Sequence, residues 1–252
     1  MQHDDEHDSA AETLTSHLAE LRNRIINALW IITIGSGLSF YFCDKIFEAI
    51  RAPIAPYLQD GGFVFLNPAD KFTAYIKVSI FAGVILTCPF WLYQAWRFVA
   101  PGLYAKEKKY SLVFILFGSF QFFVGVAFVY FLVFPMAFKF LLSFGGTTDK
   151  PMITIDEYMS FFTSTTLMFG AVFELPLVLV ILGILGIIDQ QFLREKRRYA
   201  VVLLAVVSAL VTPPDIMSML MLLVPLMLLY EMSILILGYF LKPQRNSNIR
   251  PV

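Results

Sequence analysis

The chain has 252 residues, of which 58% are hydrophobic and only 15% are charged, and its mean hydropathy is +0.71. A water-soluble globule cannot bury so large an apolar fraction, so the composition excludes a soluble domain and indicates an integral membrane protein. The formal net charge is zero, so the charge balance favours no nucleic-acid partner.

The first 24 residues divide into an acidic stretch and an amphipathic stretch. Residues 1–9 contain no apolar residue except Met1, so they are expected to form a loose tail. The following residues place apolar side chains on one helical stripe, formed by Leu14, Leu18, Leu21 and Ile25. Residues 1–24 are therefore predicted to be a cytoplasmic tail and a short amphipathic helix on the membrane surface.

Long apolar runs predict six membrane spans within a membrane domain of residues 25–241. A hydrocarbon core of about 30 Å needs roughly 20 residues of helix. The last hydrophobic block must be two spans, because the prolines of Thr212-Pro213-Pro214-Asp215 interrupt helical hydrogen bonding, and the first of these two spans reaches only about 20 Å. The expected spans are approximately 25–43, 73–96, 111–138, 158–183, 199–212 and 216–238, followed by a cytoplasmic tail at 242–252.

The distribution of basic residues predicts the orientation. With the N-terminus inside, the cytoplasmic segments carry thirteen Lys and Arg residues and the opposite face carries six. This excess places both termini in the cytoplasm. The first external loop, about Asp44 to Phe72, contains three prolines and is long enough to form a cap.

Several classes of chemistry lack their sequence signatures. No phosphate-binding G-x-x-x-x-G-K-[ST] loop occurs, so ATP hydrolysis by that route is not expected. No hydrolytic or metal-binding spacing surrounds the three histidines, and Cys43 and Cys88 lie in or beside apolar runs without a CxxC spacing, which is typical of packing. We therefore expect no catalytic residue, metal or cofactor, and a protein that binds, conducts or carries something.

Glu174 is the sharpest functional candidate, because it lies near the middle of the fourth apolar run. An ionised carboxylate at the centre of a membrane helix costs about 2.5 to 3.5 kcal/mol on insertion scales. Glu174 is interpreted either as a carboxylate that faces a groove or a partner helix, or as a neutral, hydrogen-bonded packing residue. Pro176 is expected to kink this helix.

The other acidic candidates also have local structural explanations. Asp215 is suited to cap the last span, and Glu231 is suited to reach the headgroups. Glu20 is spaced to pair with Arg24 one helical turn away, and Glu107 lies among lysines as a solvated loop charge. From the residues alone, these explanations are favoured for Glu20, Glu107 and Glu231, and the two interpretations of Asp215 are balanced.

Four motifs stand out along the chain: SHLAELRNR at 16–24, FVAPGLYAKE at 98–107, FELP at 173–176 and TPPD at 212–215. In combination they resemble TatC, the multispanning subunit of the twin-arginine translocase. Pro89-Phe90, Tyr93-Gln94-Ala95-Trp96 and the run from Tyr130 to Pro135 match as well. The motifs occur in order along essentially the whole chain and are specific in combination.

The resemblance implies a receptor and core subunit that exports folded proteins across the bacterial inner membrane, using the proton motive force. In this family the cytoplasmic face binds a signal peptide with two adjacent arginines, and the matching acidic positions are Glu20 and Glu107. A carboxylate is a suitable acceptor, because it accepts the planar guanidinium fork of an arginine. The residues implied to shape this surface are Leu21, Arg22, Phe98, Pro101, Leu103 and Tyr104.

The resemblance also implies a fold and partners. The family fold is a curved, glove-like, all-α bundle of six transmembrane helices, with Glu174 directed into its concave face. The implied partners are single-span subunits of the TatA and TatB type, which dock along the short fifth and sixth helices in a multimeric complex. The polar positions implied for docking are Thr212, Asp215 and Ser218; where many relatives carry glutamine, this chain has Met219.

Two alternatives remain at this point. A proton-coupled secondary transporter would use Glu174 as its coupling carboxylate, but such folds usually contain internal repeats and paired broken helices, and no repeat relates the two halves of this chain. A lipid-facing scaffold without cargo would make Glu20 and Glu107 dispensable.

Overall fold

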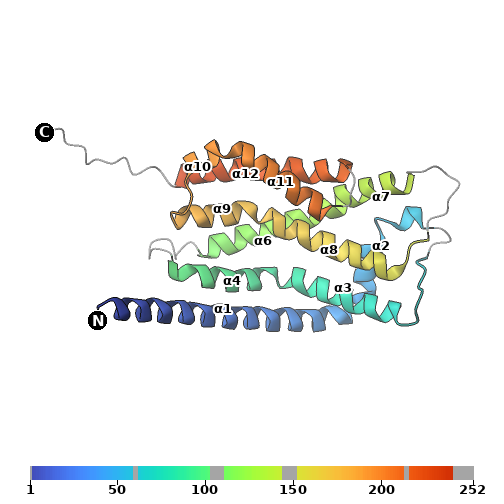
Figure 1. Cartoon of the computed structure of the whole chain (residues 1–252). Helices are drawn as coiled ribbons and strands as arrows, with labels where there is room; N and C mark the ends of the chain where they lie inside the picture. Colours follow the sequence, from blue (N-terminus) through green and yellow to red (C-terminus); the bar gives the residue numbers. More distant parts are fainter. Residues whose placement is uncertain (1, 59–61, 103–110, 144–151, 213–215, 241–252) are drawn as a thin grey trace. The chain divides into compact units, whose positions relative to one another are not determined.

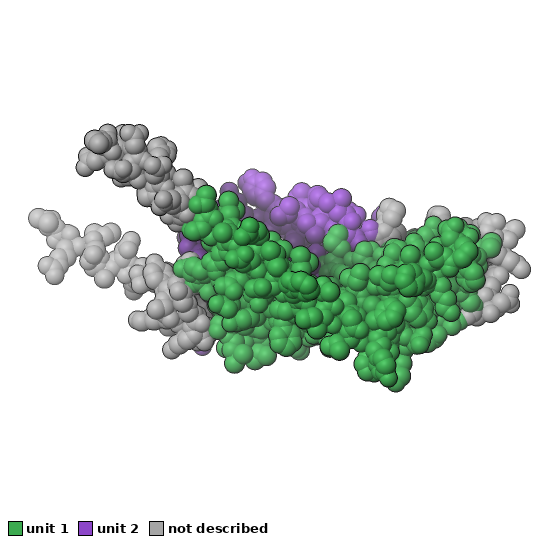
Figure 2. All heavy atoms as spheres, turned by 90° about the horizontal axis from the view of Figure 1, so that it is seen from below, with its two compact units in different colours: residues 1–170 green, residues 171–252 purple. Residues whose placement is uncertain are grey.

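The computed structural model describes residues 2–58, 62–102, 111–143, 152–212 and 216–240, and it is helical almost throughout these ranges (Figure 1). The chain divides into two compact units, unit 1 with residues 1–170 and unit 2 with residues 171–252 (Figure 2). The predicted all-α class is confirmed for the described residues.

Helix α1 (Gln2–Tyr41) runs without a break from the acidic start of the chain to the end of the first apolar run (Figure 1). The expected loose tail and separate amphipathic helix are therefore wrong, because both are part of this one helix. Residues 2–34 contain neither glycine nor proline, so nothing stops propagation of the helical hydrogen bonds. After Phe42 the chain bends by 85° into α2 (Cys43–Arg51).

The second expected span is a bent pair, α3 (Asp70–Leu86) and α4 (Cys88–Val99), with an angle of 60° between them. Pro89 lies in the first turn of α4 and cannot donate a helical hydrogen bond, and the Thr87 hydroxyl donates to the Gly83 carbonyl oxygen at 2.8 Å. A short 3₁₀ turn, η3 (Ala100–Gly102), follows α4.

Helix α1 packs along α3 and α4, and glycine allows the close approach to α3. A Cβ atom on Gly83 would lie only 2.6 Å from the backbone nitrogen of Ser36 and 2.8 Å from its Cα. Any larger residue at position 83 would therefore push the backbone of α1 away, as expected for small-residue contacts between membrane helices.

The segment between the first two spans is folded and tied to the start of α8 (Ile155–Phe173). It contains α2 and a 3₁₀ turn, η1 (Ala55–Tyr57). The backbone nitrogen of Val64 donates to the Ile153 carbonyl at 3.1 Å, and the nitrogen of Ile155 donates back to Val64 at 2.9 Å. The Tyr158 hydroxyl donates to the Ile50 carbonyl at 2.6 Å. These contacts join segments that are about a hundred residues apart in the chain.

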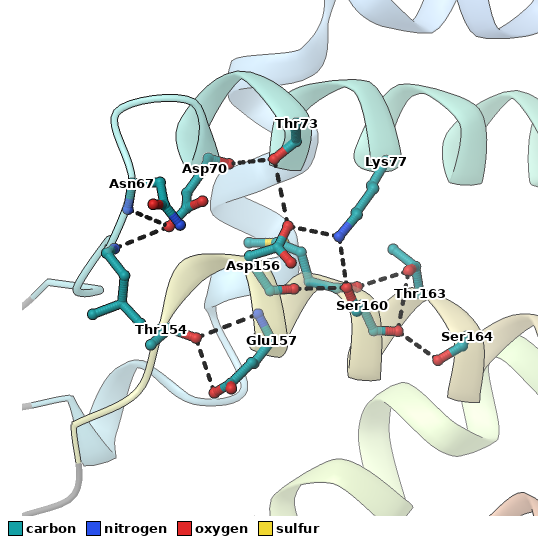
Figure 3. A network of polar contacts seen from close by, with 12 residues as sticks. Asn67, Asp70, Thr73, Lys77, Thr154, Asp156, Glu157, Ser160, Thr163 and Ser164 are labelled. Atoms are coloured by element: carbon teal, nitrogen blue, oxygen red, sulfur yellow. Dashed lines mark hydrogen bonds and ion pairs between the residues drawn. The ribbon is translucent and has the colours of Figure 1, made fainter.

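A group of polar residues holds the start of α3 beside the start of α8 (Figure 3). The Lys77 ammonium lies 2.6 Å from Asp156 Oδ1 and 2.8 Å from Ser160 Oγ, and the Thr73 hydroxyl donates to the same Asp156 oxygen at 3.4 Å. We refer to Thr73, Lys77, Asp156 and Ser160 as the Lys77 cluster.

The third span is one long helical stretch of 33 residues, from Ser111 to Ser143. It consists of α6 (Ser111–Phe128), a π-helical turn, η4 (Val129–Val133), and α7 (Phe134–Ser143). The buried Phe134 stacks on Phe162 of α8 with ring centroids 4.5 Å apart, and Phe81 of α3 meets the same ring edge-on at 5.9 Å. Aromatic packing therefore forms part of the core of unit 1.

The fourth span is broken at Glu174, between α8 and α9 (Leu175–Ile184). Pro176 occupies the first turn of α9, directly after this break, where it cannot donate a helical hydrogen bond. Gly186, two residues after the end of α9, has a φ of +72°, a conformation that glycine adopts without strain.

In unit 2, three contacts hold the short helix α10 (Gln190–Glu195) and the start of α11 (Arg197–Val211) against α12 (Ile216–Phe240). The Gln190 amide donates to the Ile234 carbonyl at 3.1 Å. The Tyr230 hydroxyl donates to the Leu193 carbonyl at 2.9 Å, and Arg197 forms an ion pair of 2.8 Å with Glu231. Glu231 therefore has an intramolecular partner rather than only the headgroups expected from the sequence.

Three described helical stretches are long and apolar enough to cross a membrane, and the two bent pairs raise this number to five. The three are Ser111–Ser143, Ile155–Ile184 and Ser218–Tyr239. Helix α11 has only 15 residues, which agrees with the prediction that the fifth apolar segment is short.

Candidate functional site

Two motifs that are distant in the sequence meet in unit 1, at the end of α4. The imidazole ring of His17 on α1 stacks on the Phe98 ring of α4, with centroids 4.5 Å apart and an interplanar angle of 21°. Because α1 packs along α4, the motif at 16–24 lies beside the beginning of the motif at 98–107. The structure therefore brings Glu20, Leu21 and Arg22 to the same end of unit 1 as Phe98.

Glu20 is held by the residue one helical turn further along α1. Arg24 Nη2 donates to Glu20 Oε1 at 3.0 Å, so the local pair expected from the spacing is confirmed. The Glu20 side chain remains 32% exposed, and its second oxygen, Oε2, accepts no hydrogen bond from the described residues. Arg22 is exposed and Leu21 is half-buried. Glu20 therefore keeps capacity for a second donor.

The remainder of this predicted surface is only partly described. Pro101 lies in η3 and is exposed. Leu103, Tyr104, Glu107 and Asp215 lie outside the described residues, so their predicted positions are neither confirmed nor contradicted.

Glu174 is buried at the break between α8 and α9, with only 7% of its surface exposed. No described group donates a hydrogen bond to either carboxylate oxygen. The alternative of a hydrogen-bonded packing residue is therefore not supported among the described residues. A buried carboxylate without a partner is costly, which is typical of a group that meets a ligand or partner.

The polar positions near the fifth and sixth apolar segments have different surroundings. The Thr212 hydroxyl donates to the Ser208 carbonyl one turn earlier on α11, at 2.8 Å. Ser218 is almost fully buried on α12, with 1% of its surface exposed, and Met219 is half-buried. Thr212 therefore contributes to its own helix, and Ser218 lies within unit 2.

Sequence reasoning missed two buried amides in unit 1. Gln121 on α6 is only 5% exposed, and neither of its amide atoms has a hydrogen-bond partner among the described residues. Gln94 on α4 has a buried Oε1 atom that also lacks such a partner. The available signal was a polar residue inside an apolar run, as for Glu174, but an uncharged amide is less conspicuous than a carboxylate.

Comparison with known proteins identifies the family. The family model described as Sec-independent protein translocase protein (TatC) matches residues 16–225. The chain belongs to the TatC family. The matched region contains every residue assigned above to the cytoplasmic surface and to the docking positions.

Individual relatives agree with this assignment. The TatC protein of Carboxydothermus hydrogenoformans is 40% identical over 239 residues, which cover 94% of this chain and 97% of the relative. The TatC protein of Desulforapulum autotrophicum is 39% identical over 222 residues, covering 88% of this chain and 82% of the relative. A crystal structure described as the twin arginine translocase receptor TatC in DDM superposes with a TM-score of 0.76 at 37% identity, covering 88% of this chain and 99% of that chain.

Membership of the TatC family sets the general role. The chain is a membrane-embedded component of the twin-arginine translocase complex, and it is a transport protein rather than an enzyme. The secondary transporter, which the residues alone left open, is thereby replaced by a protein translocase subunit.

Proposed function

We propose that this chain is the receptor of its translocase and that it binds signal peptides with two adjacent arginines through Glu20 and Glu107. The proposal includes six membrane spans and places both termini in the cytoplasm of a bacterial cell, so that both acidic residues face the arriving cargo. The positive-inside distribution of Lys and Arg supports this orientation.

The observation that carries the proposal is the state of the Glu20 carboxylate. Arg24 binds Oε1 and orients the group, while Oε2 has no donor among the described residues and the side chain is partly exposed. A guanidinium from a peptide would add a charge-assisted hydrogen bond to this pre-oriented acceptor. The neighbouring His17–Phe98 stack provides an aromatic surface for apolar and cationic side chains of the same peptide.

Two further parts of the proposal concern the membrane domain. Buried Glu174 would serve the apolar segment of the signal peptide or a partner span, during export of folded cargo powered by the proton motive force. Single-span subunits of the TatA and TatB type would dock along α11 and α12, near Thr212, Asp215 and Ser218. The short α11 supports this location, because a helix shorter than the bilayer is stabilised by association with other helices.

A crosslinking experiment tests the receptor role. A photoreactive residue replaces Pro101, and crosslinking is measured to a signal peptide that carries either Arg-Arg or Lys-Lys. We expect Glu20→Gln and Glu107→Gln each to reduce crosslinking of the Arg-Arg peptide by about tenfold, which corresponds to about 1.4 kcal/mol. The Lys-Lys peptide should crosslink poorly in every variant, because an ammonium cannot form the bidentate contact.

Glu48→Gln is the matched control, because Glu48 is an exposed glutamate that pairs with Arg51 on α2. This variant should crosslink as the unmodified protein does. Unchanged crosslinking in both Glu20→Gln and Glu107→Gln, in protein that inserts normally into membranes, would contradict the receptor role and favour a scaffold.

A further inference from the structure

Two cationic side chains in unit 2 converge on a single tyrosine ring. Lys196 Nζ lies 5.5 Å from the centroid of the Tyr199 ring, and the guanidinium carbon of Arg198 lies 4.8 Å from it. Arg198 Nη2 also donates to the Tyr199 hydroxyl at 3.1 Å. The two cations are therefore no more than about 10 Å apart. We refer to Lys196, Arg198 and Tyr199 as the Tyr199 patch.

Neither cation of the Tyr199 patch has an acidic partner among the described residues. Two glutamates of unit 2 have other partners: Glu231 forms an ion pair with Arg197 at 2.8 Å, and Glu195 accepts from Gln191 at 2.9 Å. Two like charges held this close repel each other, and an anion between them would replace the repulsion with charge-assisted hydrogen bonds. The arrangement is therefore suited to bind an anion.

The position of the patch in the chain indicates which anion it meets. The uncharged run of α11 begins at Ala200, directly after the patch, so Tyr199 lies where a membrane helix leaves the headgroup layer. Exposed apolar side chains flank it on both sides in the sequence, Phe192 before it and Val202 and Leu203 after it. An occupant with a charged head and an apolar body fits these surroundings.

We propose that the Tyr199 patch binds the headgroup phosphate of an anionic phospholipid, whose acyl chains lie against Val202 and Leu203. A zwitterionic lipid binds less well, because its own ammonium group is repelled by the two cations of the patch. Basic residues beside a membrane helix have this preference in general. Here two of them contact the same aromatic ring.

The helices that carry the patch are attached to α12, which reduces the entropic cost of binding. Gln190 and Tyr230 join α10 to α12 by hydrogen bonds of 3.1 Å and 2.9 Å, and the Arg197–Glu231 ion pair joins the first residue of α11 to α12. The basic residues are therefore presented at defined places in unit 2 rather than on a free loop.

Native mass spectrometry of the full-length protein in detergent tests the proposal. Retention of phosphatidylglycerol is compared with that of phosphatidylcholine, in the unmodified protein and in Lys196→Gln/Arg198→Gln. We expect the unmodified protein to retain phosphatidylglycerol preferentially and the double variant to lose about tenfold in apparent affinity for it. Lys196→Arg/Arg198→Lys keeps both charges and should retain the lipid, which separates lost binding from misfolding.

Arg97→Gln/Arg194→Gln is the charge-matched control. It also removes two positive charges, but Arg97 belongs to unit 1 and lies over the Tyr93 ring, 5.7 Å from its centroid. This control should keep its preference for phosphatidylglycerol. If both double variants lose the same affinity for phosphatidylglycerol, the effect comes from net charge alone and the proposal is overturned. Equal retention of the two lipids by the unmodified protein would also overturn it. Complete displacement of the lipid by inorganic phosphate would show that the patch recognises phosphate alone, and would also overturn it.

Discussion

An acidic residue lies near each end of helix α8. One of the two carboxylates is paired, and the other has no hydrogen-bond partner among the described residues. Asp156, in the first turn of α8, binds the Lys77 ammonium at 2.6 Å and accepts from Thr73, with an exposed fraction of 40% for its side chain. Glu174, directly after its last residue, is 7% exposed, and no described group donates to its carboxylate. The same chemical group therefore serves as a structural contact at one end and is left without a partner at the other.

The difference separates two uses of charge in a membrane protein. A paired carboxylate holds two elements together, and its contribution is limited because solvent screens the pair. A buried carboxylate without a partner raises the free energy of the folded protein, so its retention indicates a role outside the fold itself.

Glu174→Gln should impair export of folded cargo by about tenfold or more, equivalent to about 1.4 kcal/mol, while the melting temperature stays the same or rises. The melting temperature should not fall, because the substitution removes a buried charge that has no hydrogen-bond partner among the described residues. Export of a folded reporter and thermal unfolding in detergent measure the two effects. Glu157→Gln on the same helix is the control and should export normally. Normal export by Glu174→Gln, with a lower melting temperature, would assign Glu174 to packing.

Asp156→Asn and Lys77→Gln should each lower the stability of the protein without reducing export of cargo at moderate temperature. Because the side chains are 38% and 40% exposed, we expect a coupling of only about 0.5–1 kcal/mol between them in a double-mutant cycle. Ser164→Ala is the control, because the Ser164 hydroxyl bonds only to carbonyl oxygens of its own helix among the described residues (Figure 3). A coupling near zero would mean that the Lys77 cluster does not stabilise the fold.

Asp70→Asn should have the smallest effect, and that effect should depend on pH. Asp70 Oδ2 accepts from the backbone nitrogens of Asn67 and Leu66, both at 2.9 Å, and these hydrogen bonds hold the pKa of its carboxyl below its usual value of 3.8. The ionised group therefore contributes stability above that value, and the contribution is lost as the pH falls through the lowered pKa.

Melting temperatures at neutral pH and at about pH 3 check this expectation. The melting temperature of Asp70→Asn should be lower than that of the unmodified protein at neutral pH, and this difference should shrink in acid. Glu48→Gln, which alters an exposed carboxylate, should show no comparable change. A difference in melting temperature that grows in acid would contradict the assigned hydrogen bonds.

Much of the fold was predictable because its determinants are local. Apolar runs placed the helical stretches Ser111–Ser143, Ile155–Ile184 and Ile216–Phe240 within a few residues. Pro176 predicted the break at Glu174, and the four-residue spacing predicted the Glu20–Arg24 pair. The continuity of α1 was not predicted, because the acidic composition of residues 1–9 is typical of a loose tail. Intrinsic propensity and hydrogen-bond propagation favour one helix there.

The sequence named candidate site residues but not their contacts. The motifs and their resemblance to the family made Glu20, Phe98 and Glu174 candidates, and their role stays a prediction. The stacking of His17 on Phe98 and the isolation of Glu174 depend on which helices become neighbours, which no short-range pattern encodes.

By itself, the sequence determined the membrane class, the helical segments and the family, because hydropathy, proline and four-residue spacing act between residues that are close along the chain. Only the tertiary structure decided the Lys77–Asp156 pair, the contact of Gly83 with Ser36 and the attachment of α10 to α12. These contacts join residues that are distant in sequence, so they exist only once the helices have packed against each other.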